Sequence, residues 1–204
     1  MKNKRHLYVW FDTEYSGLDL EDAYLLQVSA LITDTSLRRM LAPVNDVTLA
    51  IRLPADKKPS PWVEENLFDL LTQCRSSEAV DVAYADEHLS AYCDKVAGSI
   101  AAQKDQRPVL AGNSVHSDWW LCKRFLPRFL TRLHYRHLDV TAFKLEWKRR
   151  HPDAEFDKEN PQLIKQYFPE AVLPVIGNRH NAYYDVQASI AELAFYRTHL
   201  FQNL

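Results

Sequence analysis

The sequence predicts one α/β domain in which a mixed five-stranded sheet is flanked by helices. Two observations support this fold class. The chain has 204 residues, of which 47% are hydrophobic and 12% aromatic, enough for one globular core. Strand-like segments come first, and helical and strand-like segments then alternate along the chain. We therefore expect residues 1–204 to form a single domain.

The first quarter of the chain predicts three strands. Residues 7–11 are β-branched and aromatic in character. Residues 25–33 and 49–53 have the same character, and Asn45-Asp46 between them is a turn sequence. The three segments are therefore expected to form an antiparallel meander.

A helix, a strand and a second helix are predicted next. Asp86 introduces an apolar stripe at the spacing of one helix face. The stripe consists of Leu89, Tyr92, Cys93, Val96 and Ile100. Residues 108–111 then form a short buried strand, and residues 118–133 form a helix that is interrupted or ended around Pro127.

One more strand and two helices complete the predicted domain. Residues 137–140 have strand character, and residues 141–150 form a helical stretch. Residues 182–199 form the last long helix, with Val186 and Ile190 on its inward face. This order of strands and helices is that of the ribonuclease H-like fold.

The charge balance argues against a protein that holds a long nucleic acid. The 25 Lys and Arg residues stand against 27 Asp and Glu residues, which gives a net charge of −2. The chain therefore lacks the global positive field that long nucleic acids require. A nucleic-acid substrate is expected to be short or gripped locally.

The cysteines and the lengths of the apolar segments indicate the cellular compartment of the protein. The three cysteines contain no Cys-x-x-Cys pair, which fits a reducing environment and no zinc cage. The apolar run before Asp12 is too short for a secretion signal, and no segment approaches the roughly 18 apolar residues of a membrane span. We expect a soluble, cytoplasmic protein with no membrane partner.

Two carboxylates follow the first strand. Asp12 and Glu14 stand at positions i and i+2, so in a strand they project from the same side. Such a like-charge pair is costly unless a cation neutralises it. A lone Asp-x-Glu also fits an ordinary strand end that enters a turn. The pair alone decides nothing.

Two further carboxylates and a histidine occur near predicted helix starts. Asp118 follows the strand at residues 108–111, so it is expected at the carboxyl end of a parallel strand, where ligands collect in open sheets. Asp185 falls in the first turn of the last helix, and His180 is expected on the loop before it. Either carboxylate also fits an ordinary helix N-terminus.

Taken together, these residues fit a two-metal phosphodiesterase centre. Asp12, Glu14, Asp118 and Asp185 offer the hard oxygen ligands that Mg²⁺ or Mn²⁺ prefers. One ion activates a water molecule in such a centre, and the other stabilises the leaving 3′-oxygen. Histidines titrate near neutral pH, so His180 suits the role of general base.

Four segments carry a resemblance to a known family. They are residues 10–19 (Trp-Phe-Asp-Thr-Glu-Tyr-Ser-Gly-Leu-Asp), 112–118, 134–141 (His-Tyr-Arg-His-Leu-Asp-Val-Thr) and 180–197. The chain resembles the DEDDh, or DnaQ-like, 3′-to-5′ exonucleases. The third segment and the closing Ala-Glu-Leu-Ala-Phe-Tyr-Arg are closer to the oligoribonuclease family within them. The resemblance implies the same metal ligands and the same base.

The resemblance also implies a substrate and its contacts. Oligoribonucleases are homodimers that cut short single-stranded RNA, above all 5′-phosphorylated dinucleotides, to mononucleotides. By similarity, Leu18 inserts between the two bases and Trp62 stacks on one of them. Stacking of this kind accepts any base because every base has a π-face.

Four more residues are implied at the 5′ end of the substrate. By similarity, Ser114, Arg136 and Thr141 cap the 5′-phosphate, and Tyr135 and Arg136 are supplied by the other subunit of the dimer. The planar guanidinium of arginine suits a terminal phosphate. A closed phosphate pocket limits substrate length without a basic groove.

Other interpretations of these residues stay open. Leu18 and Trp62 also fit turn and core packing, and Tyr135 and Arg136 also fit a pair at a strand edge. Asp139 fits a structural role better than a catalytic one, because the metal quartet is complete without it. A basic cluster fits a solvated helix face or a guide for RNA; its members are Lys144, Lys148, Arg149 and Arg150.

The chain departs from the family in three segments. Tyr15-Ser16 stands where the family usually has Met-Thr, beside Glu14. Residues 63–71 differ from the family pattern, so no substrate contact is transferred onto them, and residues 156–174 resemble the family less. Two alternative functions remain open. The first is another DEDDh exonuclease acting on longer RNA or single-stranded DNA, and the second is a catalytically inactive nucleotide-binding protein.

Overall fold

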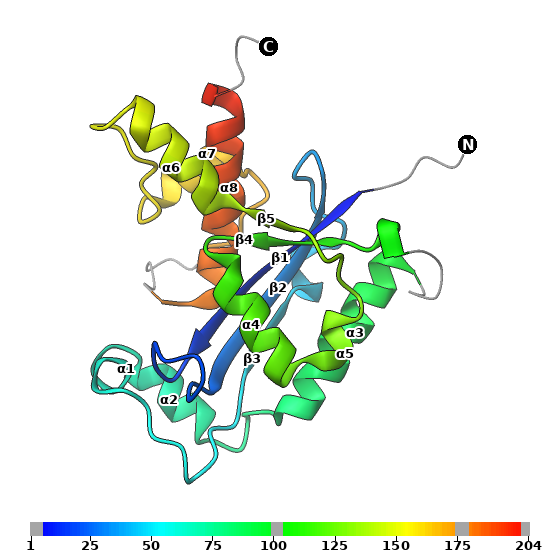
Figure 1. Cartoon of the computed structure of the whole chain (residues 1–204), viewed down its shortest axis with the longest axis vertical. Coiled ribbons are helices and arrows are strands. Elements are labelled where there is room, and N and C mark those ends of the chain that lie inside the picture. Colours follow the sequence, from blue (N-terminus) through cyan, green and yellow to red (C-terminus); the bar gives the residue numbers. More distant parts are fainter. Residues whose placement is uncertain (1–5, 99–103, 174–179, 201–204) are drawn as a thin grey trace.

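The computed structural model describes residues 6–98, 104–173 and 180–200, which form the predicted mixed sheet with helices around it (Figure 1). The five strands have the order β3-β2-β1-β4-β5. They are β1 (Leu7–Tyr15), β2 (Leu25–Asp34), β3 (Val47–Ala50), β4 (Val109–Gly112) and β5 (His137–Asp139). The first three are antiparallel, as predicted, and β4 and β5 run parallel to β1.

The helices include three that the sequence pattern did not predict. The helices are α1 (Pro61–Asn66), α2 (Phe68–Cys74), α3 (Val82–Ala97), α4 (Val115–Phe125), α5 (Pro127–Leu130), α6 (Val140–Arg150), α7 (Pro161–Tyr167) and α8 (Ala182–Leu200), with 3-10 turns at Pro43–Asn45 and Lys104–Gln106. The unpredicted helices are α1, α2 and α7, which span only six or seven residues, so each has too few turns to show a repeated apolar stripe. Both α1 and α7 begin with a proline after a capping Ser60 or Asn160.

The prediction that Asp86 introduces a helix was wrong. Helix α3 already begins at Val82, and Asp86 lies buried inside it. Its carboxylate accepts hydrogen bonds from the backbone N–H groups of Arg128 and Phe129, at 3.0 and 2.7 Å. Asp86 therefore caps the start of α5 instead of its own helix.

The third strand is shifted from its predicted position. It ends at Ala50, because Ile51 forms a parallel bridge with Val80 and the chain leaves the sheet there. Helices α4 and α5 divide at Pro127, where an interruption was predicted. Ile100, predicted on the inward face of α3, lies outside the described residues.

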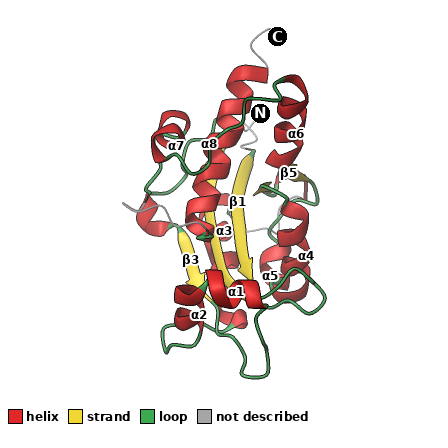
Figure 2. Ribbon diagram, turned by 90° about the vertical axis from the view of Figure 1, so that its left-hand side faces the viewer, coloured by secondary structure: helices red, strands yellow, loops and turns green. Residues whose placement is uncertain are grey.

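Two hydrophobic cores cover the two faces of the sheet. Val9 and Phe11 of β1 pack in a core with residues of α3, α4 and α5. Trp10, between them in sequence, packs in a second core with residues of α6, α7 and α8. Figure 2 shows β1 between α8 on one side and α4 and α5 on the other. The alternation of β1 therefore determines which of its polar residues face α8.

Gly112 allows β4 to approach β1 closely where the candidate ligands begin. A Cβ atom on Gly112 would lie 2.8 Å from the carbonyl oxygen of Phe11. Any larger residue would separate the two backbones. The chain that leaves β4 is thereby held beside Asp12.

Within the described residues, no helix is long and apolar enough to cross a membrane.

Candidate active site

The end of β1 and the start of α8 bring three carboxylates together. Asp12 and Glu14 continue the side of β1 that faces α8, and Asp185 lies in the first turn of that helix. One carboxylate oxygen from each of the three lies within 4.8 Å of the other two. The predicted common orientation of Asp12 and Glu14 is therefore present in the structure.

Asp118 reaches the same place from the other face of the sheet. It lies in the first turn of α4, which begins at Val115. Its buried carboxylate accepts a hydrogen bond of 2.7 Å from the hydroxyl of Thr13, the residue between Asp12 and Glu14. Asp118 thus lines the common cavity but stands outside the group of three.

The electrostatics of the site favour a bound cation. Burial raises the pKa of Asp12 well above its ordinary value, and the neighbouring carboxylates of Asp118, Asp185 and Glu14 raise it further. Burial followed by Asp185 and Asp118 raises the pKa of Glu14 to about 8. Protein groups alone therefore leave the carboxylates poorly compensated. Carboxylate oxygens at this separation, on the half-buried Asp12, Glu14 and Asp185, fit a hard divalent cation such as Mg²⁺ or Mn²⁺.

Two protein groups oppose the effect of burial on the carboxylates, since His180 lowers the pKa of Asp185 and Lys158 acts more widely. Lys158 lowers the pKa values of Asp12 and Asp185, opposing the effect of burial. Its ammonium lies 3.4 Å from the carboxylate of Glu192, which is fully buried on α8. Nothing in the local sequence around Lys158 predicts this placement.

His180 shares a cavity of about 650 Å³ with all four carboxylates. It lies on the turn before α8, as predicted, and its backbone has a φ of 59°. Its ring stands perpendicular to that of Trp62, with 4.9 Å between the ring centroids. Asp185 and His180 therefore enter the cavity from one short segment.

Leu18 and Trp62 form part of the rim of this cavity. The side chain of Leu18 is 90% exposed, and that of Trp62 is 49% exposed. Core packing therefore does not account for either residue. Trp62 lies in the first turn of α1, whose capping Ser60 donates its backbone N–H to the carbonyl of Ser16 at 2.7 Å. This bond ties α1 to the turn that carries Leu18.

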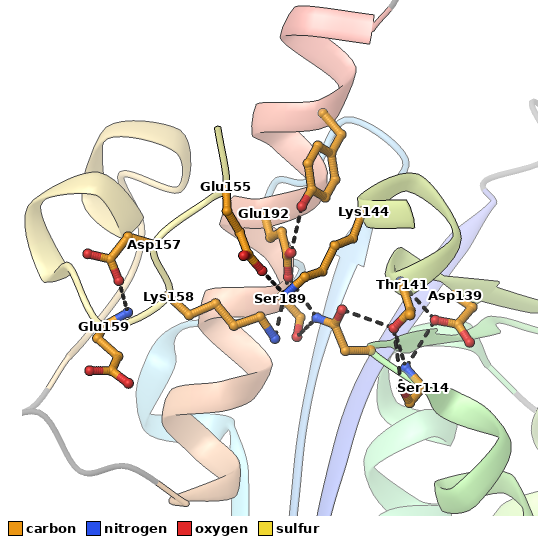
Figure 3. Close-up of polar contacts among 12 residues, drawn as sticks. Ser114, Asp139, Thr141, Lys144, Glu155, Asp157, Lys158, Glu159, Ser189 and Glu192 are labelled. Atoms are coloured by element: carbon orange, nitrogen blue, oxygen red, sulfur yellow. Dashed lines mark hydrogen bonds and ion pairs between the residues drawn. The ribbon is translucent and has the colours of Figure 1, made fainter. Parts of the chain in front are cut away.

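Ser114 and Thr141 meet beside the cavity (Figure 3). The backbone N–H of Ser114 donates to the Thr141 hydroxyl at 2.9 Å and to the Asp139 carboxylate at 3.0 Å. Asp139 also accepts the N–H of Thr141 at 2.9 Å and thereby caps α6. These bonds account for Asp139 as a structural residue.

Tyr135 and Arg136 are not among the residues that line the cavity. Tyr135 is 70% exposed, its ring stacks on that of His134, and the Arg136 guanidinium lies 5.4 Å from its centroid. The residues that line the cavity do not include these two or Thr141. Tyr135 and Arg136 therefore do not contact the cavity within this chain.

The basic residues of α6 are partly neutralised within the protein. Glu155 pairs with Lys144 and lies 3.9 Å from Lys148. Arg149 and Arg150 both contact Glu146, at 2.8 and 2.9 Å. These ion pairs favour a solvated helix face over a guide for RNA.

Comparison with proteins of known sequence shows similarity to exonucleases over most of the chain. The family model described as "Exonuclease" matches residues 9–193. An oligoribonuclease from Streptomyces avermitilis is 31% identical over 95% of this chain and 86% of that protein. A mitochondrial oligoribonuclease from Mus musculus is 30% identical over 96% of this chain and 73% of that protein.

Solved structures show the same fold. Exonuclease I from Methylocaldum szegediense matches 97% of this chain with a TM-score of 0.66 and 20% identity. Zinc-bound E. coli exonuclease I in complex with single-stranded DNA matches 97% with a TM-score of 0.67 and 15% identity. The chain spans 41% and 42% of these two longer proteins. The likeness confirms the predicted ribonuclease H-like fold.

The raised carboxylate pKa values predict that metal binding stabilises the protein more as the pH rises. In EDTA, the unfolded chain releases the Glu14 proton near pH 4.5, whereas the folded protein retains it to about pH 8. The contribution of this proton to the free energy of unfolding is fully present below about pH 4.5 and is lost as the pH rises through about 8. Mn²⁺ competes with protons for the same oxygens, so its effect grows over this range.

Thermal unfolding with EDTA or Mn²⁺ at about pH 5 and pH 8 measures this effect. We expect Mn²⁺ to raise the Tm by roughly 5 °C more at the higher pH. Glu14→Gln should reduce this difference, whereas Asp153→Asn, at an exposed position, should preserve it. An equal effect of Mn²⁺ at both pH values would contradict the assignment of the site.

Proposed function

Because the chain belongs to the exonuclease family and, within it, to the oligoribonucleases, we propose that it hydrolyses short single-stranded RNA from the 3′ end. The proposed substrates are above all 5′-phosphorylated dinucleotides, and the products are nucleoside 5′-monophosphates. The observation that carries the proposal is the meeting of Asp12, Glu14, Asp118, Asp185 and His180 in one cavity.

The four carboxylates are the proposed ligands of two divalent metal ions, Mg²⁺ or Mn²⁺. Their oxygen donors and their raised pKa values support this assignment. The bound ions supply Lewis-acid stabilisation of phosphate charge and lower the pKa of a water nucleophile. The hydrogen bond from Thr13 holds the carboxylate of Asp118 in a fixed orientation at the cavity.

His180 is the proposed general base. It lines the same cavity as the four carboxylates and acts electrostatically on Asp185, which supports a position beside a water molecule bound there. Its imidazole removes a proton from that water as the water oxygen bonds to phosphorus, while the bond from phosphorus to the 3′-oxygen breaks and that oxygen leaves with a proton from solvent. The contact with Trp62 restricts the ring on its other side.

The exposed rim residues support base binding without sequence preference. Leu18 inserts between two bases, and Trp62 stacks on one of them. Both side chains are exposed at the cavity, and each lies on a segment fixed by hydrogen bonds. Stacking on an aromatic ring contributes about 1–3 kcal/mol per base. The volume of about 650 Å³ falls within the range of cavities that enclose small ligands.

The 5′-phosphate is proposed to bind Ser114 and Thr141 together with a second subunit. Tyr135 and Arg136 are exposed and lie outside the cavity of their own chain, which supports a homodimer that supplies them in trans. The guanidinium of Arg136 then holds the terminal phosphate through charge-assisted hydrogen bonds. Such a cap closes the site after two nucleotides and thereby limits substrate length.

Hydrolysis of RNAs of two to seven nucleotides tests the proposed substrate. Each RNA carries a 5′-phosphate and is incubated with Mn²⁺, Mg²⁺ or EDTA while the products are followed over time. We expect rapid, metal-dependent loss of the dinucleotide and slow loss of the longer chains, because the phosphate cap excludes them. Equal or faster trimming of longer RNA or single-stranded DNA would support exonuclease activity but contradict the proposed phosphate cap. No cleavage would instead indicate a nucleotide-binding protein.

Mixed dimers test the contribution of the second subunit. Asp12→Ala removes a metal ligand and is expected to lower kcat at least ~1,000-fold. Arg136→Ala is expected to raise KM for the 5′-phosphorylated dinucleotide by roughly tenfold or more, because it removes a charge-assisted hydrogen bond. Each variant alone is therefore poorly active at low substrate concentration.

Mixing the two variants should restore activity if Arg136 acts in trans. A heterodimer then contains one site with an intact Asp12 and the intact Arg136 of the other subunit. Random exchange of subunits of a twofold dimer restores about a quarter of the wild-type sites. Thermal unfolding of each variant provides the control for folding. Activity no greater than the sum of the two variants would exclude Arg136 as a residue supplied in trans.

A further inference from the structure

Glu192 is a buried acid with no part in the proposed reaction. It lies on α8, seven residues after the ligand Asp185, and is fully buried. Its two oxygens accept hydrogen bonds from the Tyr196 hydroxyl at 2.8 Å and from the side-chain amide of Asn113 at 3.0 Å. Lys158 lies 3.4 Å away, on the side of the metal ligands. Glu192 therefore accepts hydrogen bonds from two side chains and forms an ion pair with a third.

Stability alone does not explain this arrangement. A buried carboxylate is costly unless it is paired and hydrogen-bonded. Replacing a buried ion pair with well-packed apolar residues is often neutral or stabilising. What Glu192 contributes must therefore be sought in the groups that it orients.

Asn113 is the group that Glu192 orients. Its amide nitrogen donates to Glu192 and to the hydroxyl of Ser189, at 3.0 and 2.8 Å. A carboxylate only accepts and an amide nitrogen only donates, so Glu192 fixes which end of the amide faces α8. The amide oxygen of Asn113 therefore points to Thr141, whose hydroxyl donates to it at 3.3 Å.

Thr141 transmits this orientation to Ser114. Because its one hydroxyl proton is given to Asn113, the oxygen of Thr141 is left to accept the backbone N–H of Ser114 at 2.9 Å. Ser114 has a left-handed backbone, with φ 52° and ψ 38°, which a serine adopts only under external constraint. Its hydroxyl lies 3.2 Å from that of Thr141 (Figure 3).

We propose that Glu192 is a positioning residue for recognition of the 5′-phosphate, acting through Asn113 on the hydroxyls of Thr141 and Ser114. The inference rests on the proposed function, in which the terminal phosphomonoester binds at this turn: the Ser114 hydroxyl donates to it, and Thr141, whose proton stays on Asn113, holds the turn in shape. Thr141 stays bound to Asn113, so the turn keeps its shape while the Ser114 hydroxyl rotates from Thr141 to donate to the phosphate. Lys158 balances the charge of Glu192 and allows it to remain an acceptor in the core.

The test compares two dinucleotides that differ only at the 5′ end. One carries a 5′-phosphate and the other a 5′-hydroxyl, and the readout is the ratio of their kcat/KM values. Glu192→Met and Asn113→Ala should each lower this ratio about tenfold, the effect of losing one hydrogen bond to a charged group. The loss should appear as a higher KM for the phosphorylated substrate, with kcat for the 5′-hydroxyl substrate little changed.

Two further variants serve as controls. Glu192→Gln should retain most of the ratio, because its amide oxygen can still accept from Asn113 while its nitrogen donates to the Tyr196 hydroxyl. Tyr196→Phe removes a different hydrogen bond to Glu192 and leaves Asn113 in place, so the ratio should stay within about twofold of wild type. Thermal unfolding of every variant identifies losses due to misfolding.

The possible outcomes separate the two proposals. A wild-type ratio near one would contradict phosphate recognition and therefore the proposed function. A high wild-type ratio that is unchanged in Glu192→Met and Asn113→Ala would overturn the role of Glu192 alone. An equal fall in Tyr196→Phe would also overturn it, since it would indicate general loosening of the core. If Glu192→Met does not fold, the result for Asn113→Ala decides.

Discussion

The repulsion among buried carboxylates is the constraint on which the site depends. Asp12, Glu14 and Asp185 lie together, and Asp118 adds a fourth acid from the opposite face of β1. Burial raises the pKa values of all four, and neighbouring carboxylates raise those of Asp12 and Glu14 further, so the folded chain holds this arrangement against an electrostatic cost. A divalent cation removes that cost when it binds. Its binding free energy is largest when the carboxylates are already in place, because none of it is then used to order them. Metal affinity thus depends on how rigidly the fold holds them.

The surrounding structure supplies that rigidity. Gly112 lets β4 pack against the end of β1, which places α4 and Asp118 beside Asp12. On the other face, a buried ion pair between Arg39 and Asp46 is linked to α8, because the Tyr183 hydroxyl donates to Asp46 at 2.8 Å. Arg39 also donates to the Gln187 side chain at 3.1 Å. The first turn of α8, which carries Asp185, is therefore anchored independently of any metal.

The sequence predicts those features that depend on local periodicity. Alternation in β1 correctly predicts that Asp12 and Glu14 share a face, and the order of strands and helices correctly predicts the fold class. Local periodicity does not reveal the roles of Asp86 and Glu192, since Arg128 and Asn113, the residues that they orient, lie 42 and 79 residues away in the chain. The sequence does contain a signal for Glu192. This residue stands two helical turns after Asp185 in the mostly apolar helix α8, so the two carboxylates lie along the same side of the helix. Lys158 has no comparable pattern, because its position depends on the path of the irregular segment that precedes α7.

Diffraction from crystals grown with Mn²⁺ tests the central claim most directly, because the anomalous signal locates the metal without assuming a reaction. The account predicts Mn²⁺ within roughly 2.0–2.4 Å of carboxylate oxygens of Asp12, Glu14 and Asp185, with Asp118 beside a second ion. Loss of the signal in crystals of Asp185→Asn would confirm that these side chains form the site. Well-ordered carboxylates with no anomalous peak at saturating Mn²⁺, or a peak elsewhere on the chain, would contradict the account.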